Sequence, residues 1–356
     1  MNSPLVNLIV FVLGGALAAL VFWPGRGLFA RGRRNRRLAN RVALEDALKH
    51  VYNHEVREDA CTLSSVAGAL GVSSTRAVTL VDRMQRGGLL RLVDGRLLLT
   101  DDGRRYALEV VRAHRLWERY LADETGVDPV EWHERAEKEE HALSAEAANA
   151  LAARLGHPRF DPHGDPIPTA DGAVGAEPGV PLAELAPGQH GVLTHLEDEP
   201  PVVFAQLVAM GLYVGMEVRM DARSEQRIVF DADGRKIVLA PILASNVSVR
   251  RLQEPVVTPD EMATLAVLKP GESADVVRVS PACRGLERRR LMDLGIVAGT
   301  RVMYERPGLT GGLCAYRVRD TLIALREEQA SMIGVTNIHR AGSPDRAGHK
   351  REPAQS

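Results

Sequence analysis

The carboxy-terminal half of the chain contains the same sequence pattern twice, and this duplication limits the folds that it can adopt. Residues 210–218 read MGLYVGMEV, and residues 294–302 read LGIVAGTRV. A Leu-x-Pro-Gly motif precedes each copy. Such internal similarity indicates that one small unit follows another. The short alternating segments within each copy favour five-stranded SH3-like β-barrels, which we place at residues 181–252 and 263–340.

A second stretch is rich in histidine and carboxylate side chains at helical spacing. Its potential metal ligands are His114, Glu118, His133, Glu137, Glu140 and His141. Residues three or four apart share one helix face, so we expect two helices that each present a ligand-bearing face. Asp128 is a suitable N-cap and Pro129 a suitable first residue for the second helix, which lets the chain fold back. The alternative is a solvated helix face, because residues 134–140 mix acidic and basic side chains.

The segment before this stretch has the pattern of a winged helix. Residues 63–70 form a short helical pattern, residues 71–73 a turn, and residues 74–86 an amphipathic helix. Residues 89–100 read as two strands joined across Asp94-Gly95, which is a hairpin turn signal. This order predicts a helix-turn-helix followed by a β-hairpin. The alternative is a winged helix that contacts only other proteins.

Together these patterns resemble the diphtheria toxin repressor family of iron- and manganese-dependent transcriptional repressors. The resemblance extends over residues 38–252. It implies a winged-helix DNA-binding domain at residues 42–106 and a helical metal-binding and dimerisation domain at residues 107–168. It identifies both barrels as FeoA-type domains, of which the second is more similar to free-standing FeoA proteins of ferrous-iron transport. The implied fold class is multidomain α+β.

The resemblance also implies two metal sites. Its primary site corresponds to Asp46, Glu137, Glu140 and His141, and its ancillary site to His114, Glu118 and His133. Oxygen and imidazole ligands favour Mn(II) or Fe(II) over thiophilic metals. Asp46 and Glu137 match manganese-type members, whereas the complete ancillary trio matches iron-type members, so both metals stay open. Lys49 stands where manganese-type members have a carboxylate, and its ammonium group would oppose a second cation.

Other residues follow from the same resemblance. The recognition-helix positions of the family, which contact DNA, correspond to Ser73, Thr75, Arg76 and Thr79. In iron-type members the SH3-like domain lends a glutamate and a glutamine to the ancillary site. The aligned positions here are Pro200 and Val203, with Glu199 nearby, so we expect this contribution to be weak or absent. His157 and His163 are interpreted as polar linker residues rather than ligands.

The amino-terminal residues form an uncharged apolar run that is followed by arginines. Residues 5–23 are about long enough to span a bilayer core at ~1.5 Å per residue. The arginines that follow place the amino terminus outside and the rest in the cytoplasm, according to the positive-inside rule. We therefore expect a single-pass cell-membrane anchor at residues 1–24 and a basic juxtamembrane segment at residues 25–41. A buried helix is the alternative.

The remaining features concern the compartment and the connecting segments. Cys61, Cys283 and Cys314 are scattered and too few for a disulfide framework, which agrees with a reducing cytoplasm. Residues 156–181 are rich in Pro and Gly, and residues 169–180 predict a flexible linker. Residues 341–356 predict a disordered polar tail.

The sequence therefore predicts a membrane-tethered, dimeric regulator of transcription that needs Mn(II) or Fe(II). We expect it to repress metal-uptake genes and to bind a palindromic operator in double-stranded DNA. The alternative is a membrane-anchored adaptor, whose FeoA-type domains contact a ferrous-iron or manganese transporter without DNA binding. The chain contains no nucleophile elbow, P-loop or dinucleotide fingerprint, so we do not expect an enzyme.

Overall fold

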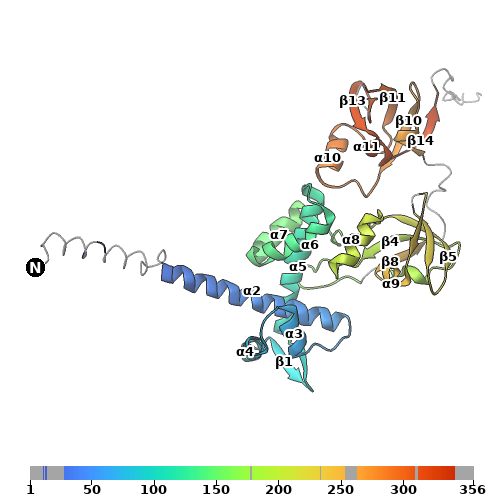
Figure 1. Ribbon diagram of the computed structural model, residues 1–356. Helices are drawn as coiled ribbons and strands as arrows, with labels where there is room; N and C mark the ends of the chain where they lie inside the picture. The colour runs from blue at the N-terminus through green and yellow to red at the C-terminus, as the bar shows by residue number, and fades with distance from the viewer. Residues whose placement is uncertain are drawn as a thin grey trace, which may run out of the picture. The chain divides into compact units, whose positions relative to one another are not determined.

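The computed structural model describes residues 28–176, 179–232, 234–252, 263–308 and 312–340, together with Phe11 and Leu13. The chain divides into two compact units. The first unit contains residues 1–114, 137–150 and 168–174, and the second contains residues 115–136, 151–167 and 175–356. Helix α5 (Asp101–Glu124) contributes residues to both units. Figure 1 labels the helices and strands along the chain.

The first unit contains the predicted helix-turn-helix. Its helices are α2 (Leu28–Val56), α3 (Leu63–Ala69) and α4 (Ser74–Arg86). Thr62 and Ser65 cap α3 reciprocally, because the Thr62 side chain accepts from the Ser65 N–H at 3.2 Å and Ser65 Oγ accepts from the Thr62 N–H at 3.0 Å. Gly71 has a φ of 60° in the turn, where a side chain would be strained. Ser73 then caps α4.

The predicted hairpin follows α4. It consists of β1 (Leu90–Val93) and β2 (Arg96–Leu99), which pair antiparallel with Leu90 opposite Leu99. Asp94 and Gly95 have φ values of 50° and 77°, and a two-residue type I′ turn requires this pair of positive angles. The sequence signal at this turn is therefore confirmed.

One apolar core holds the helix-turn-helix and the hairpin together. Leu48 and Val51 of α2 pack with Met84 of α4 and Leu97 of β2, and none of these four side chains is more than 1% exposed. Burial of each side chain contributes about 1.5–3 kcal/mol. Helix α2 is thus a structural part of the helix-turn-helix fold as well as the carrier of Asp46.

The ligand-bearing segment differs from the long second helix that we predicted. Asp128 does cap the start, accepting from the Val130 N–H at 3.1 Å, but the first turn is the 3-10 helix η1 (Pro129–Glu131). The elements that follow are α6 (Trp132–Glu139), the 3-10 turn η2 (Glu140–Ala142) and α7 (Ala145–Arg154). Glu140 and His141 therefore lie on a tightened turn, whose side-chain directions differ from those of a continuous α-helix.

The second unit contains two β-sheets with the same order of strands, and this confirms the predicted duplication. The first copy comprises β3 (Val180–Pro181), η3 (Leu182–Glu184), β4 (His190–Leu196), α8 (Pro201–Ala209), β5 (Glu217–Arg223), β6 (Ile228–Ala232), β7 (Arg235–Leu239), α9 (Pro241–Ala244) and β8 (Val247–Leu252). Its sheet order is β3-β8-β4-β5-β6-β7. Each described sheet has six strands rather than five, because a two-residue edge strand joins it.

The second copy repeats the first element by element. It comprises β9 (Ala263–Thr264), η5 (Leu265–Val267), β10 (Ser273–Val279), α10 (Gly285–Asp293), β11 (Arg301–Pro307), β12 (Leu313–Val318), β13 (Thr321–Arg326), α11 (Glu327–Ser331) and β14 (Ile333–His339). Its sheet order is β9-β14-β10-β11-β12-β13. Each copy has a separate apolar core, with Phe230 fully buried in the first and Tyr316 2% exposed in the second.

The predicted membrane anchor at residues 1–24 lies outside the described residues, apart from Phe11 and Leu13. The predicted tail at residues 341–356 lies outside them as well. Among the helices that the structure describes, none is both long and apolar enough to cross a bilayer.

Candidate metal centre

Three of the four predicted primary ligands come together in the first unit. Asp46 lies on α2, while Glu140 and His141 lie on η2, and one ligand atom from each lies within 4.8 Å of the other two. His141 Nε2 is 3.1 Å from Asp46 Oδ1 and 3.6 Å from Glu140 Oε1. We call Asp46, Glu140 and His141 the first cluster. Two carboxylates and one imidazole nitrogen at these distances can converge on one divalent cation.

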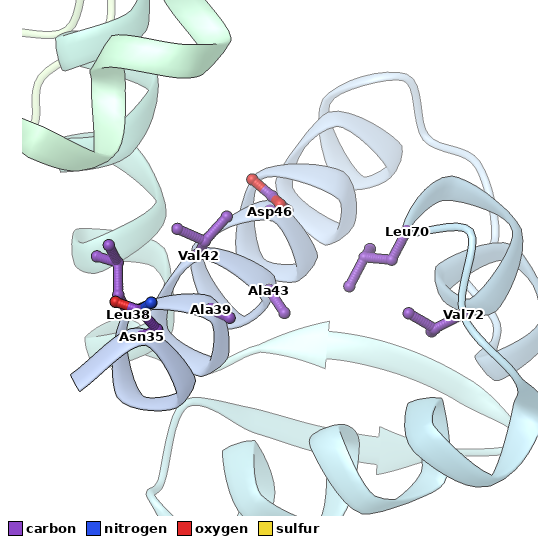
Figure 2. A pocket seen from close by; sticks show the side chains of 8 residues that line it. All are labelled: Asn35, Leu38, Ala39, Val42, Ala43, Asp46, Leu70 and Val72. Carbon is purple, nitrogen blue, oxygen red and sulfur yellow. The ribbon is translucent and has the colours of Figure 1, made fainter. Parts of the chain in front are cut away.

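Asp46 reaches this cluster from the edge of a pocket. The pocket has a volume of about 350 Å³ and lies between α2 and the turn of the helix-turn-helix, where Leu70 and Val72 face the helix (Figure 2). The Asp46 side chain is 39% exposed, whereas Glu140 is 3% exposed. An ion can therefore approach the cluster from the Asp46 side.

Glu140 is a buried carboxylate that forms hydrogen bonds with the side chains of Lys49 and His114. Lys49 Nζ lies 3.1 Å from both carboxylate oxygens, and His114 Nδ1 contacts Oε2 closely. Burial raises the pKa of Glu140, but the hydrogen bonds and charges of His114 and Lys49 outweigh it, and the pKa lies below its ordinary value. Glu140 is therefore ionised at neutral pH and available as an anionic ligand.

Glu45 is a functional residue that the sequence reasoning missed. It is 6% exposed on α2, its Oε2 lies 2.6 Å from His141 Nδ1, and its Oε1 accepts from the Tyr106 O–H at 2.6 Å. A carboxylate on Nδ1 fixes the tautomer that leaves Nε2 for a metal. Its position directly before Asp46 was the available signal, since a helix that supplies a ligand can also supply that ligand's support.

The same contacts control the protonation of His141. Burial lowers the pKa of His141, but hydrogen bonds to Asp46 and Glu45 and the charge of Glu140 raise it to about 9. Without metal, the imidazolium is therefore the cation of the cluster at neutral pH. A metal ion must displace the proton on Nε2, so metal and proton compete for this nitrogen.

Glu137 does not join the first cluster in the structure. Its side chain is 49% exposed, and its Oε1 lies 3.8 Å from Lys49 Nζ. The Lys49 ammonium therefore has carboxylates of Glu137 and Glu140 beside it. This arrangement agrees with the expectation that Lys49 opposes a second cation at this place.

A second group of potential ligands lies in the second unit. Glu118 of α5, His163 and Asp198 each offer one atom within 4.8 Å of the others. His133 Nδ1 lies 2.8 Å from Asp198 Oδ2 and 3.2 Å from Glu118 Oε1. We call Glu118, His133, His163 and Asp198 the second cluster. It contains two of the three predicted ancillary residues.

The third predicted ancillary residue, His114, also lies near this group, because His114, Glu118 and His133 each offer one ligand atom within 4.8 Å of the other two. It lies one helical turn before Glu118 on α5, and its Nδ1 bonds to Glu140 of the first cluster. His114 therefore orients a ligand of the first cluster in the metal-free structure.

His163 corrects our interpretation of a polar linker residue. It is 1% exposed, its ring lies against Trp132 and Phe204, and its Nε2 is 3.6 Å from Glu118 Oε1. Neither ring nitrogen has a hydrogen-bond partner among the described residues. Leaving buried polar atoms unsatisfied costs about 1–3 kcal/mol each, and a cation beside Nε2 would offset part of this cost. The donor set thus fits a divalent metal ion.

Asp198 of the first SH3-like domain is a candidate ligand that the sequence reasoning did not name. It follows β4, and its side chain is 12% exposed. Burial raises the pKa of Asp198, but the hydrogen bond from His133 and the charges of His163 and His133 lower it below the ordinary value. The aligned positions Pro200 and Val203 have no side-chain ligand atoms, and the candidate carboxylate is that of Asp198, two residues before Pro200.

The four predicted DNA-contacting residues lie on the open face of the recognition helix. Ser73, Thr75, Arg76 and Thr79 are exposed, whereas Ala77, Leu80, Val81 and Met84 of α4 are buried. Ser73 accepts from the Arg76 N–H at 3.4 Å, and Thr79 Oγ1 donates to the Thr75 carbonyl at 2.9 Å. Short polar side chains and one guanidinium therefore face solvent together, as contacts to phosphates and base edges require.

We expect His141 to titrate near pH 9 in metal-free protein. The raised pKa means that the imidazolium contributes stability that is fully present below about pH 6.5 and is lost as the pH rises through 9. An NMR titration of the imidazole protons in chelator-treated protein measures this midpoint. Asp46→Asn removes one anionic partner and should lower it. An unchanged midpoint would contradict the contact between the two side chains.

Comparison with known proteins places these residues in a family. Residues 100–169 match the model of the iron dependent repressor metal-binding and dimerisation domain. Residues 180–251 and 263–337 each match the FeoA domain. Glu118, His133, Glu140, His141 and His163 all fall within the first match.

Similarities to individual proteins indicate the same family. The chain is 37% identical over 140 residues to the iron-dependent repressor IdeR of Mycobacterium tuberculosis, a match that spans 39% of this chain and 61% of that repressor. A solved structure described as a manganese-dependent transcriptional repressor in complex with manganese is 34% identical, with a TM-score of 0.54, and covers 58% of this chain and 99% of its own. The diphtheria toxin repressor of Corynebacterium glutamicum is 31% identical over 218 residues, which are 58% of this chain and 95% of that protein. The chain therefore belongs to the diphtheria toxin repressor family.

Proposed function

We propose that the chain is a metal-dependent, DNA-binding transcriptional repressor that acts as a dimer. The observation that carries this proposal is the place of Asp46. It lies on α2, whose Leu48 and Val51 are in the core of the helix-turn-helix, while Glu140 and His141 lie on η2 outside that core. An ion bound to all three residues would stabilise the arrangement in which α2 and η2 approach each other.

The protein's own residues prepare this site in defined ways. Glu45 holds His141 by Nδ1, and Lys49 and His114 keep the buried Glu140 ionised. A divalent metal would supply the concentrated positive charge that the imidazolium of His141 supplies without it. The ion would bind more tightly when α2 and η2 are close together than when they are apart. This difference in affinity limits how far the metal can shift DNA binding.

The proposed metal is Mn(II) or Fe(II). Asp46, Glu140 and His141 offer oxygen and nitrogen atoms and no sulfur, which suits these ions better than thiophilic ones. The relatives named above are an iron-dependent and a manganese-dependent repressor, and this similarity supports the same pair of metals. We further propose that two recognition helices of a dimer read half-sites of a palindromic operator about one helical turn apart.

The switch is tested by Asp46→Ala. Because Asp46 is 39% exposed and lies outside the apolar core, the variant should fold and dimerise like the parent. We expect the stimulation of operator binding by Mn(II) to fall by at least about 10-fold, since even the loss of an outer-shell partner weakens metal sites by that factor. A fluorescence anisotropy titration on DNA, with and without Mn(II), measures the stimulation.

The matched control is Glu134→Ala on α6. Glu134 is exposed and belongs to neither cluster, so its variant should respond to Mn(II) as the parent does. If Asp46→Ala and the parent show the same Mn(II) dependence, the first cluster is not the sensor. If neither protein binds any DNA selected from a random pool, the repressor proposal fails as a whole.

We also propose that the second cluster binds an ancillary ion. Glu118 also belongs to the predicted trio with His114 and His133, and His163 and Asp198 extend this set of candidate ligands. Glu118 and His163 are each 1% exposed, and neither ring nitrogen of His163 has a hydrogen-bond partner within the described part of the chain. Both observations support a cation at this place. Asp198 would tie the first SH3-like domain to the dimerisation domain through that ion.

Asp198→Asn tests the ancillary ion. Calorimetric titration of the parent with Mn(II) should resolve two binding steps per subunit, and the variant should lose at least about 10-fold in the affinity of only one step. Glu184→Gln is the control, because Glu184 is 55% exposed and pairs with Arg251 instead. A parent with a single step, or a variant with both steps unchanged, would refute the assignment.

We propose, finally, that residues 1–24 anchor the chain in the cell membrane with the other domains in the cytoplasm. The support is the uncharged run at residues 5–23 and the arginines that follow it. The full chain should sediment with membranes and resist extraction by alkaline carbonate, whereas a chain that begins at Ala39 should be soluble. Recovery of the intact full chain in the supernatant would contradict the anchor. That result would also remove the reason to expect a contact between the FeoA-type domains and a metal transporter in the membrane.

A further inference from the structure

A third group of potential ligands lies within the DNA-binding fold and takes no part in either cluster. His50 and His54 stand four residues apart on α2, with ring centroids 4.5 Å apart and an interplanar angle of 76°. Cys61 lies in the segment that leads into α3 and is 2% exposed. One ligand atom from each of the three lies within 4.8 Å of the other two.

The hydrogen bonds around this group cannot satisfy the side chains of both His50 and Cys61. Ser65 Oγ lies 3.2 Å from His50 Nε2 and 3.4 Å from Cys61 Sγ. Its single proton goes to the Thr62 carbonyl at 2.8 Å, and one of its two lone pairs accepts from the Thr62 N–H. Only one lone pair is left for two candidate donors.

His54, the third member of the group, also has a ring nitrogen that the described residues leave unsatisfied. His54 Nδ1 is buried and has no hydrogen-bond partner among the described residues. Leaving a buried ring nitrogen unpaired costs about 1–3 kcal/mol. A cation that accepted electron pairs from the two imidazoles and the sulfur would remove this deficit, because it needs no hydrogen-bond donor from the protein.

The backbone around the group is fixed by contacts that do not depend on it. The Cys61 carbonyl accepts from the Leu97 N–H at 2.9 Å, and the capping contacts of Thr62 hold the start of α3. Glu55 Oε1 accepts from the Leu99 N–H at 2.8 Å, which ties α2 to β2. The three ligands therefore project from a rigid frame of α2, α3 and the hairpin.

We propose that His50, His54 and Cys61 form a binding site for a thiophilic divalent ion, with Zn(II) as the best match. Imidazole and thiolate are both common ligands of Zn(II), and a three-ligand site leaves one position for water. Tetrahedral bonds of about 2.0–2.3 Å place ligand atoms roughly 3.5 Å apart. The observed separations of up to 4.8 Å close to this value by side-chain rotation.

The protonation of the group is compatible with such an ion. Burial and the charge of His54 lower the pKa of His50, so this imidazole is neutral at pH 7 and can donate its electron pair. Burial raises the pKa of Cys61, so the thiol keeps its proton until a cation arrives. Binding therefore releases one proton from Cys61 Sγ to solvent as the metal–sulfur bond forms.

The site differs in chemistry from the first cluster, although α2 carries residues of both. Asp46, Glu140 and His141 offer no sulfur, whereas Cys61 supplies a soft ligand. An ion at His50, His54 and Cys61 would fix α2 to the start of α3 without involving η2. It would therefore stabilise the helix-turn-helix itself and leave the proposed Mn(II) or Fe(II) switch free to operate.

The experiment uses the full chain and Co(II) as a spectroscopic probe for Zn(II). Thiolate ligation gives a sulfur-to-cobalt charge-transfer band in the near ultraviolet, which oxygen and nitrogen ligands do not give. We expect this band to grow and saturate as Co(II) is added, to disappear on addition of Zn(II), and to be absent in Cys61→Ser. Cys314→Ser should keep the band, because Cys314 lies in the second β-sheet.

A second variant keeps the test independent of the buried cysteine. His54→Gln should bind Co(II) with at least about 10-fold lower affinity at the sulfur-containing site, and His157→Gln, at an exposed position of the second unit, should bind normally. A parent chain without the band, or a band that survives in Cys61→Ser, overturns the proposal. The result does not depend on DNA binding, so it is separate from the test of the repressor function.

Discussion

The structure depends on how the chain accommodates a carboxylate that is almost fully removed from water. Glu140 is 3% exposed, and an ionised carboxylate at such a place loses several kcal/mol of hydration. Lys49 and His114 compensate this loss from two sides, one from α2 and one from α5. Removing either partner would leave an uncompensated charge, so the contacts of Glu140 determine where α2 and η2 can lie.

The charges around Glu140 also explain the form of the first cluster without metal. Lys49 lies where the family resemblance predicts a carboxylate in manganese-type members, and it contacts Glu140 and approaches Glu137. Its ammonium provides one permanent positive charge at this place. The protonated His141 provides another beside Asp46 and Glu45. Asp46 and Glu140, the two carboxylates of the first cluster, therefore each have a cationic neighbour before any ion binds, and a metal has to replace the proton of His141.

Local sequence signals predicted the features that a few neighbouring residues determine. The Asp94-Gly95 turn, the cap at Asp128 and the buried face of α4 each follow from a few neighbouring residues, and each is present. The duplicated β units followed from internal similarity alone. The change from α6 to the 3-10 turn η2 could not be predicted in this way, because the residues at 134–140 all favour a helix and tertiary contacts of Glu140 and His141 override that preference.

The candidate site residues also divide into those with a signal in the sequence and those that only tertiary contacts reveal. Asp46, Glu118, His133, Glu140 and His141 were found by spacing and resemblance, whereas Glu45, His163 and Asp198 act through contacts between segments far apart in the chain. Asp161 illustrates why His163 was missed. Its Oδ1 accepts from three successive backbone N–H groups, those of His163, Gly164 and Asp165, each at 2.9 Å. These bonds bend the chain into a tight loop and bury His163, although the composition of the segment is that of a linker.

Helix α2 combines three tasks that usually lie on separate elements. It provides the core residues of the helix-turn-helix, it carries Asp46 toward η2, and it presents His50 and His54 toward Cys61. Asp46 lies about one helical turn before His50, so the first cluster and the proposed third site use the same stretch of α2. The first cluster has only oxygen and nitrogen ligands, whereas the proposed third site includes the sulfur of Cys61. This difference in ligand chemistry would let the two sites take different ions, although they share one helix.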